Sequence, residues 1–255
     1  VYIELNTNEL YGRNLTAGAL DVMGQYYSVA SSSHAFYNYG GLVYTGNDEK
    51  ALFDNMWQKC YAVIACCNTI IEKCDENKAG LSPVWRGSIK GEALALRAML
   101  HFDMLRLFGP LTSELDKESI PYQTNSDQTV TPLLSGSEVV GLILDDLKNA
   151  VGLLKDTDPY FVEEEFSDTD LNYRRFRMNY FAAKGLMARV QLWGGDKEKA
   201  AATAKEVIAE GQAEGAEFFP FVTNSEATSS NPDRVFYSEV LFGTYHSSRE
   251  KLHED

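Results

Sequence analysis

The segment Gly91–Pro110, GEALALRAMLHFDMLRLFGP, restricts the fold of this chain most strongly, because it predicts one long helix with a defined end. Apolar residues recur along it at the spacing of one helix face: Leu94, Ala98, Leu105 and Phe108. Gly109 and Pro110 follow, and they end helices because glycine accepts a left-handed cap and proline cannot continue the helix. An apolar stripe of this length needs other helices to cover it.

The same periodicity predicts further helices, so the expected fold class is all-α. The helix that contains Gly91 is expected to begin at Ser88. Ser135 and Glu138 form a capping box that predicts the start of another helix. Asp196 is a suitable N-cap for the predicted helix over 197–208. The predicted helices cover 49–74, 88–108, 135–155, 178–193 and 197–208.

The remaining segments are expected to be irregular. Residues 111–134 form a long polar connection that directly follows Pro110 and contains Pro121 and Pro132. A connection of this length predicts a packed or functional surface loop. Residues 16–29 are expected to hold a short helix, and 1–5 and 235–242 are compatible with short strands. We expect an aromatic-rich irregular segment over 1–48.

A weak internal repeat connects two of the predicted helices. Aligning Gly109 with Gly194, 85 residues further on, matches small or apolar positions in the helices that precede them. The stretch that begins at Gly194, GGDKEKAAATAKEVIAEG, has a glycine–aspartate turn and then an alanine-faced helix. This rhythm is typical of tetratricopeptide repeats, so the pattern predicts stacked antiparallel helix pairs with long irregular loops.

Charge and hydropathy exclude several classes of function. The formal net charge of −14 and the lack of a basic stripe argue against nucleic-acid binding and against docking on anionic lipid. The longest apolar run, Tyr61–Cys67, is seven residues, which is too short to span a bilayer. An apolar content of 44% is enough for a normal globular core.

The four cysteines show neither a disulfide nor a metal pattern. Cys60, Cys67 and Cys74 follow one another at intervals of seven residues, which places neighbours about 10.5 Å apart along a helix, beyond disulfide reach. The adjacent pair Cys66–Cys67 would strain the backbone if bridged, and there is no CxxC. We expect these side chains to be small buried groups of a helix face, with no metal and no cofactor.

The acidic segment 156–170 allows two interpretations. It carries seven carboxylates, so a calcium site is conceivable, but it lacks the spacing and the glycine of an EF-hand. A solvated loop is the simpler interpretation. The basic cluster that follows is expected to neutralise this loop: Arg174, Arg175 and Arg177.

No catalytic constellation is present in the sequence. There is no HExxH, no GxSxG and no Walker loop. Asp145 and Asp146 are adjacent on a predicted helix and point apart, which does not suit glycosidase chemistry. His101 and Asp103 do not face each other, so a packed histidine is expected. We therefore expect no enzyme and no catalytic residues.

Three segments in order resemble the SusD/RagB family. The first is GEALALRAMLHFDMLRLFGP, which is similar to the family's signature helix. The second is MNYFAAKGLMARVQLWGGDKEKAAATAKEVI. The third is LYGRNLTAGALDVMGQYY with the later MWQKCYAVIACCNTIIEK, in which the family's early helix pattern falls on Trp57, Tyr61, Ile64 and Asn68. Together they cover roughly residues 10 to 210.

The resemblance implies a helical core of tetratricopeptide-like pairs and a non-catalytic role. Members of the family are cell-surface lipoproteins of the outer membrane that capture glycans for a SusC-like, TonB-dependent transporter. The RagB branch binds peptides, which is the first alternative. A tetratricopeptide-type scaffold for protein partners is the second.

Two departures from the family follow from the residues present. The lipid-bearing N-terminal cysteine of the family is not among residues 1–255, so the membrane anchor is expected outside them. Family members are also longer. The resemblance thus implies that 1–255 is the N-terminal portion of one SusD-like domain: 1–48 an irregular aromatic-rich segment, 49–211 the helix-pair core, and 212–255 an irregular segment that leads to a C-terminal half.

The leading candidate for a ligand site is the aromatic loop before Trp57. Seven of the 14 tyrosines lie before residue 45. Aromatic rings stack on the apolar faces of sugars, and amide and carboxylate groups bind hydroxyls. The loop supplies both kinds of group: Phe36, Tyr37, Asn38, Tyr39, Tyr44 and Asp48. The competing interpretation is that these rings cover the helical core or contact the transporter.

Overall fold

The structure is a computed structural model of the chain, and it describes residues 1–127, 129–213 and 216–245. The described part forms two compact units. One consists of Val1–Cys66 with the described residues that follow Gly243, and the other is Cys67–Gly243. The long helix α4, Asn47–Glu76, contributes its first part to one unit and its last part to the other.

Helix α5, Pro83–Phe108, is the central element of the unit Cys67–Gly243. It begins five residues before the predicted start, because Ser82 caps it and Pro83 fits the first helical position. The Ser82 hydroxyl accepts a hydrogen bond from the Trp85 N–H at 3.3 Å. Leu94, Ala98 and Leu105 of the predicted stripe are buried, and the buried surface is wider than the stripe, since α5 is buried on nearly every side from Gly87 to Leu105. Helices α6 and α8 and strand β1 all pack against it.

Helix α6, Gly136–Thr157, lies antiparallel to α5 at close range. Its capping box is present as predicted, with Glu138 N–H donating to Ser135 Oγ at 3.3 Å. A Cβ added at Gly91 would lie 2.7 Å from Leu154 Cγ, so glycine is what allows the approach. Further along, Arg97 of α5 pairs with Asp146 of α6, which fixes the antiparallel register.

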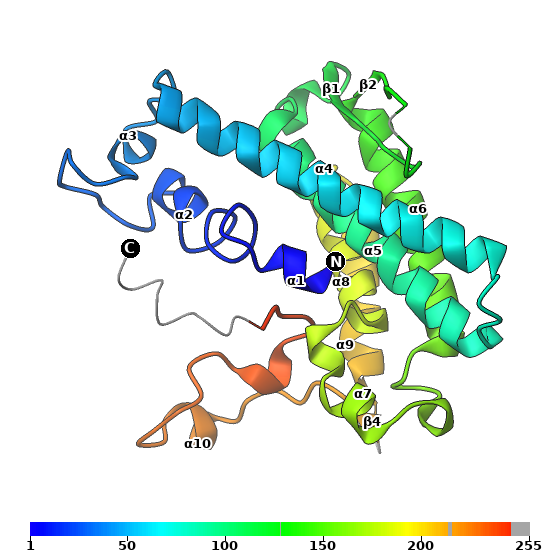
Figure 1. The fold of residues 1–255 in the computed structure, drawn as a ribbon. Coiled ribbons are helices and arrows are strands. Elements are labelled where there is room, and N and C mark those ends of the chain that lie inside the picture. Colours follow the sequence, from blue (N-terminus) through cyan, green and yellow to red (C-terminus); the bar gives the residue numbers. More distant parts are fainter. Residues whose placement is uncertain (128, 214–215, 246–255) are drawn as a thin grey trace. The chain divides into compact units, whose positions relative to one another are not determined.

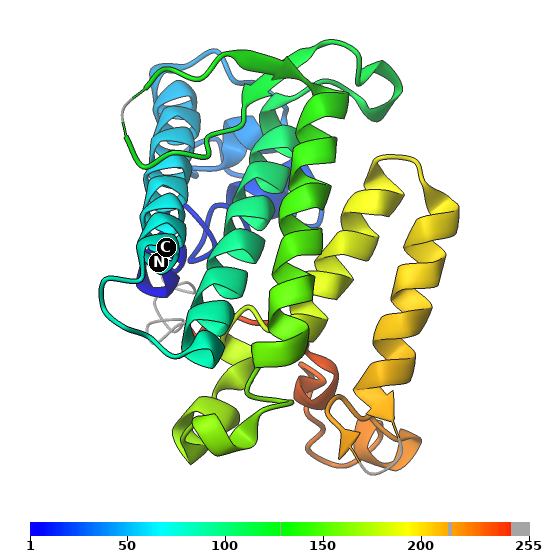
Figure 2. The same ribbon diagram turned by 90° about the vertical axis from the view of Figure 1, so that its right-hand side faces the viewer.

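A second antiparallel pair is formed by α8, Tyr180–Trp193, and α9, Lys197–Gly211. The turn between them contains Gly195 at φ +92°, a conformation that favours glycine, and Asp196 caps α9 as predicted. Gln191 and Thr203 are joined across the pair by a hydrogen bond of 2.9 Å. Figure 2 shows α5, α6, α8 and α9 side by side, and their packing follows the same order. The predicted all-α fold of tetratricopeptide-like pairs is confirmed.

The end of α5 differs from the prediction in its physical cause. Gly109 has φ −86° and ψ −179°, so it is extended and not left-handed. A Cβ there would lie 2.5 Å from the Leu105 carbonyl oxygen and 2.7 Å from Ser119 Oγ. Glycine at this position is therefore needed for close approach of the following chain.

The connection after α5 holds more structure than expected. It contains a 3-10 turn, η1, Thr112–Glu114, and a small antiparallel sheet of β1, Glu118–Pro121, and β2, Leu133–Ser135. After α6 come η2, Glu163–Glu165, α7, Asp168–Asn172, and η3, Arg174–Phe176. Beyond α9 lie β3, Gln212–Ala213, its partner β4, Ala216–Glu217, then α10, Asn224–Ala227, and η4, Tyr237–Glu239. The strand expected at 235–242 is replaced by η4.

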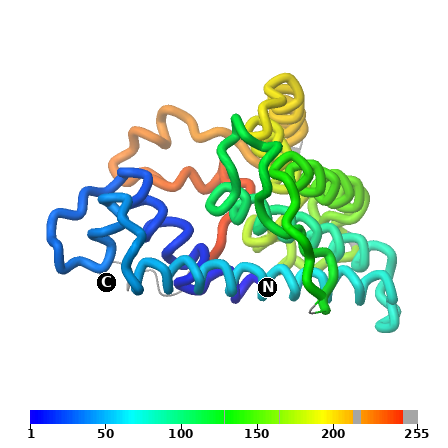
Figure 3. The backbone as a smooth tube through the Cα atoms, turned by 90° about the horizontal axis from the view of Figure 1, so that it is seen from above, coloured from blue at the N-terminus to red at the C-terminus, as the bar shows by residue number. Residues whose placement is uncertain are grey.

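The unit that begins at Val1 is largely irregular, as Figure 3 shows for its blue backbone. The strand expected at 1–5 is instead the short helix α1, Tyr2–Leu5. The expected short helix within 16–29 is α2, Ala19–Met23, and the aromatic loop contains a further turn, α3, Tyr37–Gly40 (Figure 1). Leu5, Leu10 and Leu15 are buried and supply much of this unit's core.

None of the four cysteines forms a disulfide, and all four lie in the described part of the chain. Cys60, Cys67 and Cys74 are buried along α4, as the seven-residue spacing predicted, and Cys66 is exposed. The stripe is therefore a packing feature.

Candidate ligand-binding site

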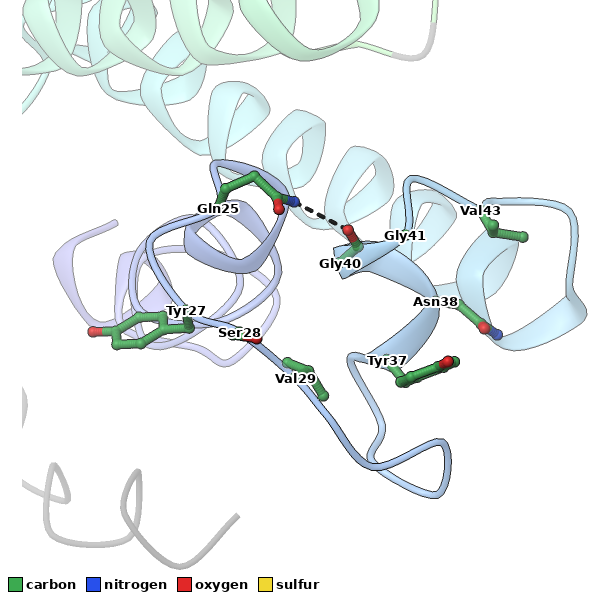
Figure 4. A pocket seen from close by; sticks show the side chains of 9 residues that line it. All are labelled: Gln25, Tyr27, Ser28, Val29, Tyr37, Asn38, Gly40, Gly41 and Val43. Atoms are coloured by element: carbon green, nitrogen blue, oxygen red, sulfur yellow. Dashed lines mark hydrogen bonds between the residues drawn. The ribbon is translucent and has the colours of Figure 1, made fainter.

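A hollow of about 370 Å³ lies within the first unit, between two segments of its irregular chain (Figure 4). One wall follows α2, and the other is α3 with the residues after it. Its volume falls at the lower end of the range of roughly 300–1,000 Å³ that small-molecule sites occupy. The residues that line it are Gln25, Tyr27, Ser28, Val29, Tyr37, Asn38, Gly40, Gly41 and Val43.

Gln25 holds the two walls together. Its backbone is left-handed, with φ 63°, and this turns the chain directly after α2. Its side-chain Nε2 donates to the Gly40 carbonyl oxygen at 3.0 Å, as Figure 4 shows, and lies 3.3 Å from the Val22 carbonyl oxygen. The hydrogen bond to Gly40 spans 15 residues and connects the segment after α2 to α3.

The surface of the hollow combines aromatic rings with amides. Tyr27 is 55% exposed and Tyr37 is 42% exposed, so both offer ring area and a hydroxyl to a ligand. Asn38 is exposed, and its Nδ2 donates to Glu49 Oε1 at 2.8 Å. This hydrogen bond holds the pKa of the Glu49 carboxyl below its usual range, so Glu49 stays ionised and fixes the Asn38 amide. The Asn38 side-chain oxygen has no hydrogen-bond partner in the described part of the chain.

The structure divides the six predicted site residues into two groups. Tyr37 and Asn38 line the hollow. Phe36, Tyr39 and Tyr44 belong instead to an apolar cluster around Ala19 and Val22, with Leu52 and Phe53 of α4 packed on it. Asp48 is exposed in the first turn of α4 and does not line the hollow.

Tyr39 is the centre of that cluster. It is 2% exposed, and its ring centroid lies 5.8 Å from that of Phe36, 5.9 Å from Phe53 and 6.3 Å from Tyr44. Burial raises the pKa of its phenol to about 12. The competing interpretation, that the rings cover the core, therefore holds for Tyr39, while the hollow beside it is formed by residues on either side of Tyr39 in the sequence.

Sequence reasoning missed one wall of the hollow. Gln25, Tyr27 and Ser28 were not among the predicted site residues, although they lie only nine to twelve residues before Tyr37. The signal that could have found them was the doublet Tyr26–Tyr27, two residues after Gly24, in a segment too short and polar for a core helix. Its rings are 81% and 55% exposed.

The hollow has the chemistry of a site for a neutral ligand rich in hydroxyl groups. Aromatic faces bind the apolar faces of such ligands, and amide and hydroxyl groups bind their polar edges. Tyrosine is the only titratable type among its lining residues. Within residues 1–127, 129–213 and 216–245, no group of three or more His, Cys, Asp or Glu side chains is placed to hold a metal ion, and no helix is long and apolar enough to cross a membrane.

One carboxylate of the acidic segment considered for calcium, Asp158, is paired with an arginine. Asp158 is fully buried and accepts from Arg174 Nε at 2.9 Å and from Nη2 at 2.7 Å. Glu92 of α5 contacts the same guanidinium. The expectation that the basic cluster neutralises this loop is confirmed for Arg174.

The second unit contains a buried polar cluster that sequence reasoning did not foresee. Arg97 donates to Asp146 through two hydrogen bonds and to Asn68 Oδ1 through a third of 2.9 Å. Tyr122 donates to Asp146 Oδ2 at 2.5 Å and stacks on His101, with ring centroids 4.0 Å apart. Arg97 and His101 belong to α5, Asn68 to α4 and Asp146 to α6, and Tyr122 follows β1, so the cluster joins four parts of the chain.

His101 was expected to be packed, and it is fully buried. Its Nε2 accepts from the Gln123 N–H at 3.0 Å, so the proton is on Nδ1, which donates to the Arg97 carbonyl oxygen at 2.9 Å. Burial lowers the pKa of the imidazole to about 3. His101 is therefore a neutral structural group that holds the chain after β1 against α5.

The sequence matches a family profile over residues 16–192. The family, SusD-like, is described as "Starch-binding associating with outer membrane". The chain belongs to this family. Curated relatives carry the same description of SusD-like protein: one from Formosa agariphila is 34% identical over 96 residues, and one from Bacteroides ovatus is 30% identical over 146 residues. These matches cover 37% and 56% of this chain.

Solved structures of SusD-like proteins share the fold of this chain. A SusD-like carbohydrate-binding protein from Bacteroides vulgatus superimposes with a TM-score of 0.66 at 24% identity, over 85% of this chain and 41% of that one. A laminarin-binding SusD-like protein superimposes with a TM-score of 0.58 at 20% identity, over 77% of this chain and 38% of that one. A protein solved with a xylogluco-oligosaccharide superimposes with a TM-score of 0.57 at 21% identity, over 88% of this chain and 41% of that one.

The chain spans only part of the proteins it resembles. The aligned residues make up 17% and 23% of the two curated relatives and less than half of each of these three solved structures.

Proposed function

We propose that this chain is part of a non-catalytic SusD-like protein and that it captures carbohydrate at the hollow formed by the segments 25–29 and 37–43. The observation that carries the proposal is the pairing of exposed Tyr27 and Tyr37 rings with the fixed Asn38 amide in one hollow. Membership of the family and the saccharide ligands of two structural neighbours support the ligand class.

The arrangement suits binding better than turnover. Glycoside hydrolysis needs a pair of carboxyl groups at the scissile bond, and the residues that line the hollow include neither Asp nor Glu. Glu49 lies behind Asn38, where it orients the amide. A saccharide bound here keeps its glycosidic bonds.

The proposal extends to the place of the protein in the cell. We infer a cell-surface lipoprotein of the outer membrane that delivers its ligand to a SusC-like, TonB-dependent transporter. Residues 1–255 would be the N-terminal portion of the SusD-like domain, with the lipid anchor outside them. The family description and the coverage of the longer relatives support this reading.

Calorimetric titration of the chain tests the ligand class. The probes are maltohexaose, laminarihexaose and a xyloglucan oligosaccharide, with tripeptides and pentapeptides in parallel, and chromatography of the mixtures after incubation. We expect heat from at least one saccharide and no shortening of it. Heat from peptides alone would replace the proposal with a RagB-like peptide-binding function, and shortened saccharide would contradict the non-catalytic role.

A further inference from the structure

A second hollow, of about 350 Å³, lies within the unit Cys67–Gly243. Its floor is the first turns of α5, and its walls are the chain from Phe166 through α7 to the residues after η3. These two parts lie next to each other near the start of α5 (Figure 2). The hollow belongs to one unit and shares no residue with the proposed site.

Aromatic rings form one side of this second hollow. The rings of Trp85 and Phe166 contact each other, with centroids 4.6 Å apart, so the indole is held in place. Tyr173 is 58% exposed and presents its ring to the solvent side. Neither Trp85 Nε1 nor the Tyr173 hydroxyl has a hydrogen-bond partner in the described part of the chain. Two aromatic groups with unused donors are therefore available at the same hollow.

A serine hydroxyl faces the same space. Ser88 of α5 is 3% exposed and lines the hollow, yet its hydroxyl makes no hydrogen bond to any other described residue. Among the described residues, the buried side-chain atoms without a partner are Asn6 Oδ1 and Ser119 Oγ, so Ser88 Oγ is reached by solvent from the hollow. A ligand hydroxyl in the hollow would supply the missing partner.

The charges around this hollow balance. Glu92 and Asp170 oppose Arg174 and Arg177 among its lining residues. The Arg174 guanidinium is already paired with Asp158 and Glu92, and it is buried. Asp170 is engaged by Ser167, whose hydroxyl lies 2.7 Å from Asp170 Oδ2, and this contact lowers the pKa of the carboxyl. Charges that are satisfied in this way favour a neutral, hydroxyl-bearing ligand over a phosphate or a charged peptide.

We propose that the hollow between Trp85, Ser88 and Tyr173 is a second saccharide-binding site. The saccharide stacks on the exposed aromatic rings, and its hydroxyls pair with Ser88 Oγ and Trp85 Nε1. The inference takes its ligand class from the proposed function but uses residues of a different unit. The chain then carries two separate sites, one in each unit, for the same class of ligand.

The test uses the chain labelled with 5-fluorotryptophan. It has three tryptophans, Trp57, Trp85 and Trp193, so fluorine NMR gives three signals, which single Trp→Phe variants assign. We expect titration with maltohexaose or laminarihexaose to shift the Trp85 signal, and to do so equally in the Tyr37→Ala variant. Tyr173→Ala is expected to weaken the saccharide affinity obtained from the Trp85 signal about tenfold, or ~1.4 kcal/mol. Tyr26→Ala is expected to leave that affinity unchanged.

The outcomes separate the inference from the proposed function. If calorimetry detects saccharide binding that Tyr37→Ala abolishes, and the Trp85 signal does not move at saturating saccharide, the second site is overturned and the proposed function stands. If Trp85 responds but Tyr37→Ala leaves total binding unchanged, the second site stands and the first hollow is excluded. If no saccharide gives heat or a shift, both fail.

Discussion

Arg97 and Asp146 form a two-pronged ion pair in the core of the second unit. Arg97 Nε lies 2.7 Å from Asp146 Oδ2, and Nη2 lies 2.7 Å from Oδ1. Both side chains are less than a tenth exposed. Because one comes from α5 and the other from α6, the pair fixes the register of the two helices that contact each other most extensively.

Removing one partner of this pair should destabilise the chain strongly. Asp146→Ala leaves the Arg97 guanidinium buried without its carboxylate, which costs about 3–5 kcal/mol of unfolding free energy. The neighbouring Asp145 is exposed, so Asp145→Ala should change stability by less than about 0.5 kcal/mol. Urea unfolding followed by circular dichroism measures both. Equal effects of the two variants would show that the pair does not hold the core.

His101 should make stability depend on pH. The pKa of the imidazole is about 3 in the folded chain and near its ordinary 6.5 when unfolded. The unfolded chain therefore binds a proton below pH 6.5 that the folded chain refuses, so this contribution is complete above pH 6.5 and is lost as pH falls toward 3. Between pH 7 and pH 5 the loss is about 2 kcal/mol.

His101→Gln provides the comparison. Glutamine can donate to the Arg97 carbonyl and accept from Gln123, but it does not titrate. Unfolding free energies of both proteins at the two pH values give the difference, which should be about 2 kcal/mol larger for the wild type. The same pH dependence in both proteins would mean that His101 is accessible to protons in the folded chain.

The starts of the helices and the turn between α8 and α9 could be predicted from neighbouring residues, but the buried polar core around Arg97 could not. Capping residues at Ser135 and Asp196 and the turn at Gly195 act within a few residues, so the sequence indicates them directly. An arginine in a helix pattern is normally expected at the surface. The local sequence does not show that Arg97 is buried, because its partner Asp146 lies 49 residues away. The burial of α5 is hidden for the same reason, since α6, α8 and β1, which pack against it, all come from later parts of the chain.

Two glycines in paired helices should respond oppositely to alanine. At Gly91 a Cβ would lie 2.7 Å from Leu154 Cγ and 3.3 Å from the Ala150 carbonyl oxygen, so Gly91→Ala should lower stability by about 1–3 kcal/mol. At Gly141 of α6 nothing lies within 4 Å, so Gly141→Ala should raise stability by about 0.5–1 kcal/mol through helix propensity. Thermal unfolding distinguishes them. A gain at both sites would contradict the close approach of α5 and α6.

Tyr39 should act through packing and not through its hydroxyl. No hydrogen bond joins its hydroxyl to any other residue that the structure describes, so Tyr39→Phe should leave stability and saccharide affinity unchanged. Tyr39→Ala removes a buried ring and should cost about 3–5 kcal/mol. Denaturant unfolding and calorimetry of the two variants test this. A large loss of affinity in Tyr39→Phe, with stability intact, would make the phenol a ligand contact.

The candidate site could be predicted only in part for a related reason. Residue types alone do not separate Tyr37 from Tyr39, because both lie in one irregular loop and differ only in which side of α3 they occupy. The structure assigns Tyr39 to the core and Tyr37 to the hollow. The other wall of the hollow, after α2, was not predicted. It depends on a side-chain hydrogen bond from Gln25 to the Gly40 carbonyl oxygen, and no sequence pattern indicates that bond.

The saccharide affinity of Tyr37→Ala decides whether the first hollow binds carbohydrate. Tyr26→Ala is the matched control, because Tyr26 is an exposed tyrosine of the same unit that does not line the hollow. Tyr173→Ala weakens binding at the second hollow, and the Trp85 fluorine signal checks this. Calorimetry of Tyr37→Ala in a protein that also carries Tyr173→Ala therefore measures the first hollow by itself. In that background we predict that Tyr37→Ala weakens binding at least about tenfold, or ~1.4 kcal/mol, with unchanged unfolding. Equal affinity of the Tyr37→Ala and Tyr26→Ala proteins would contradict the account.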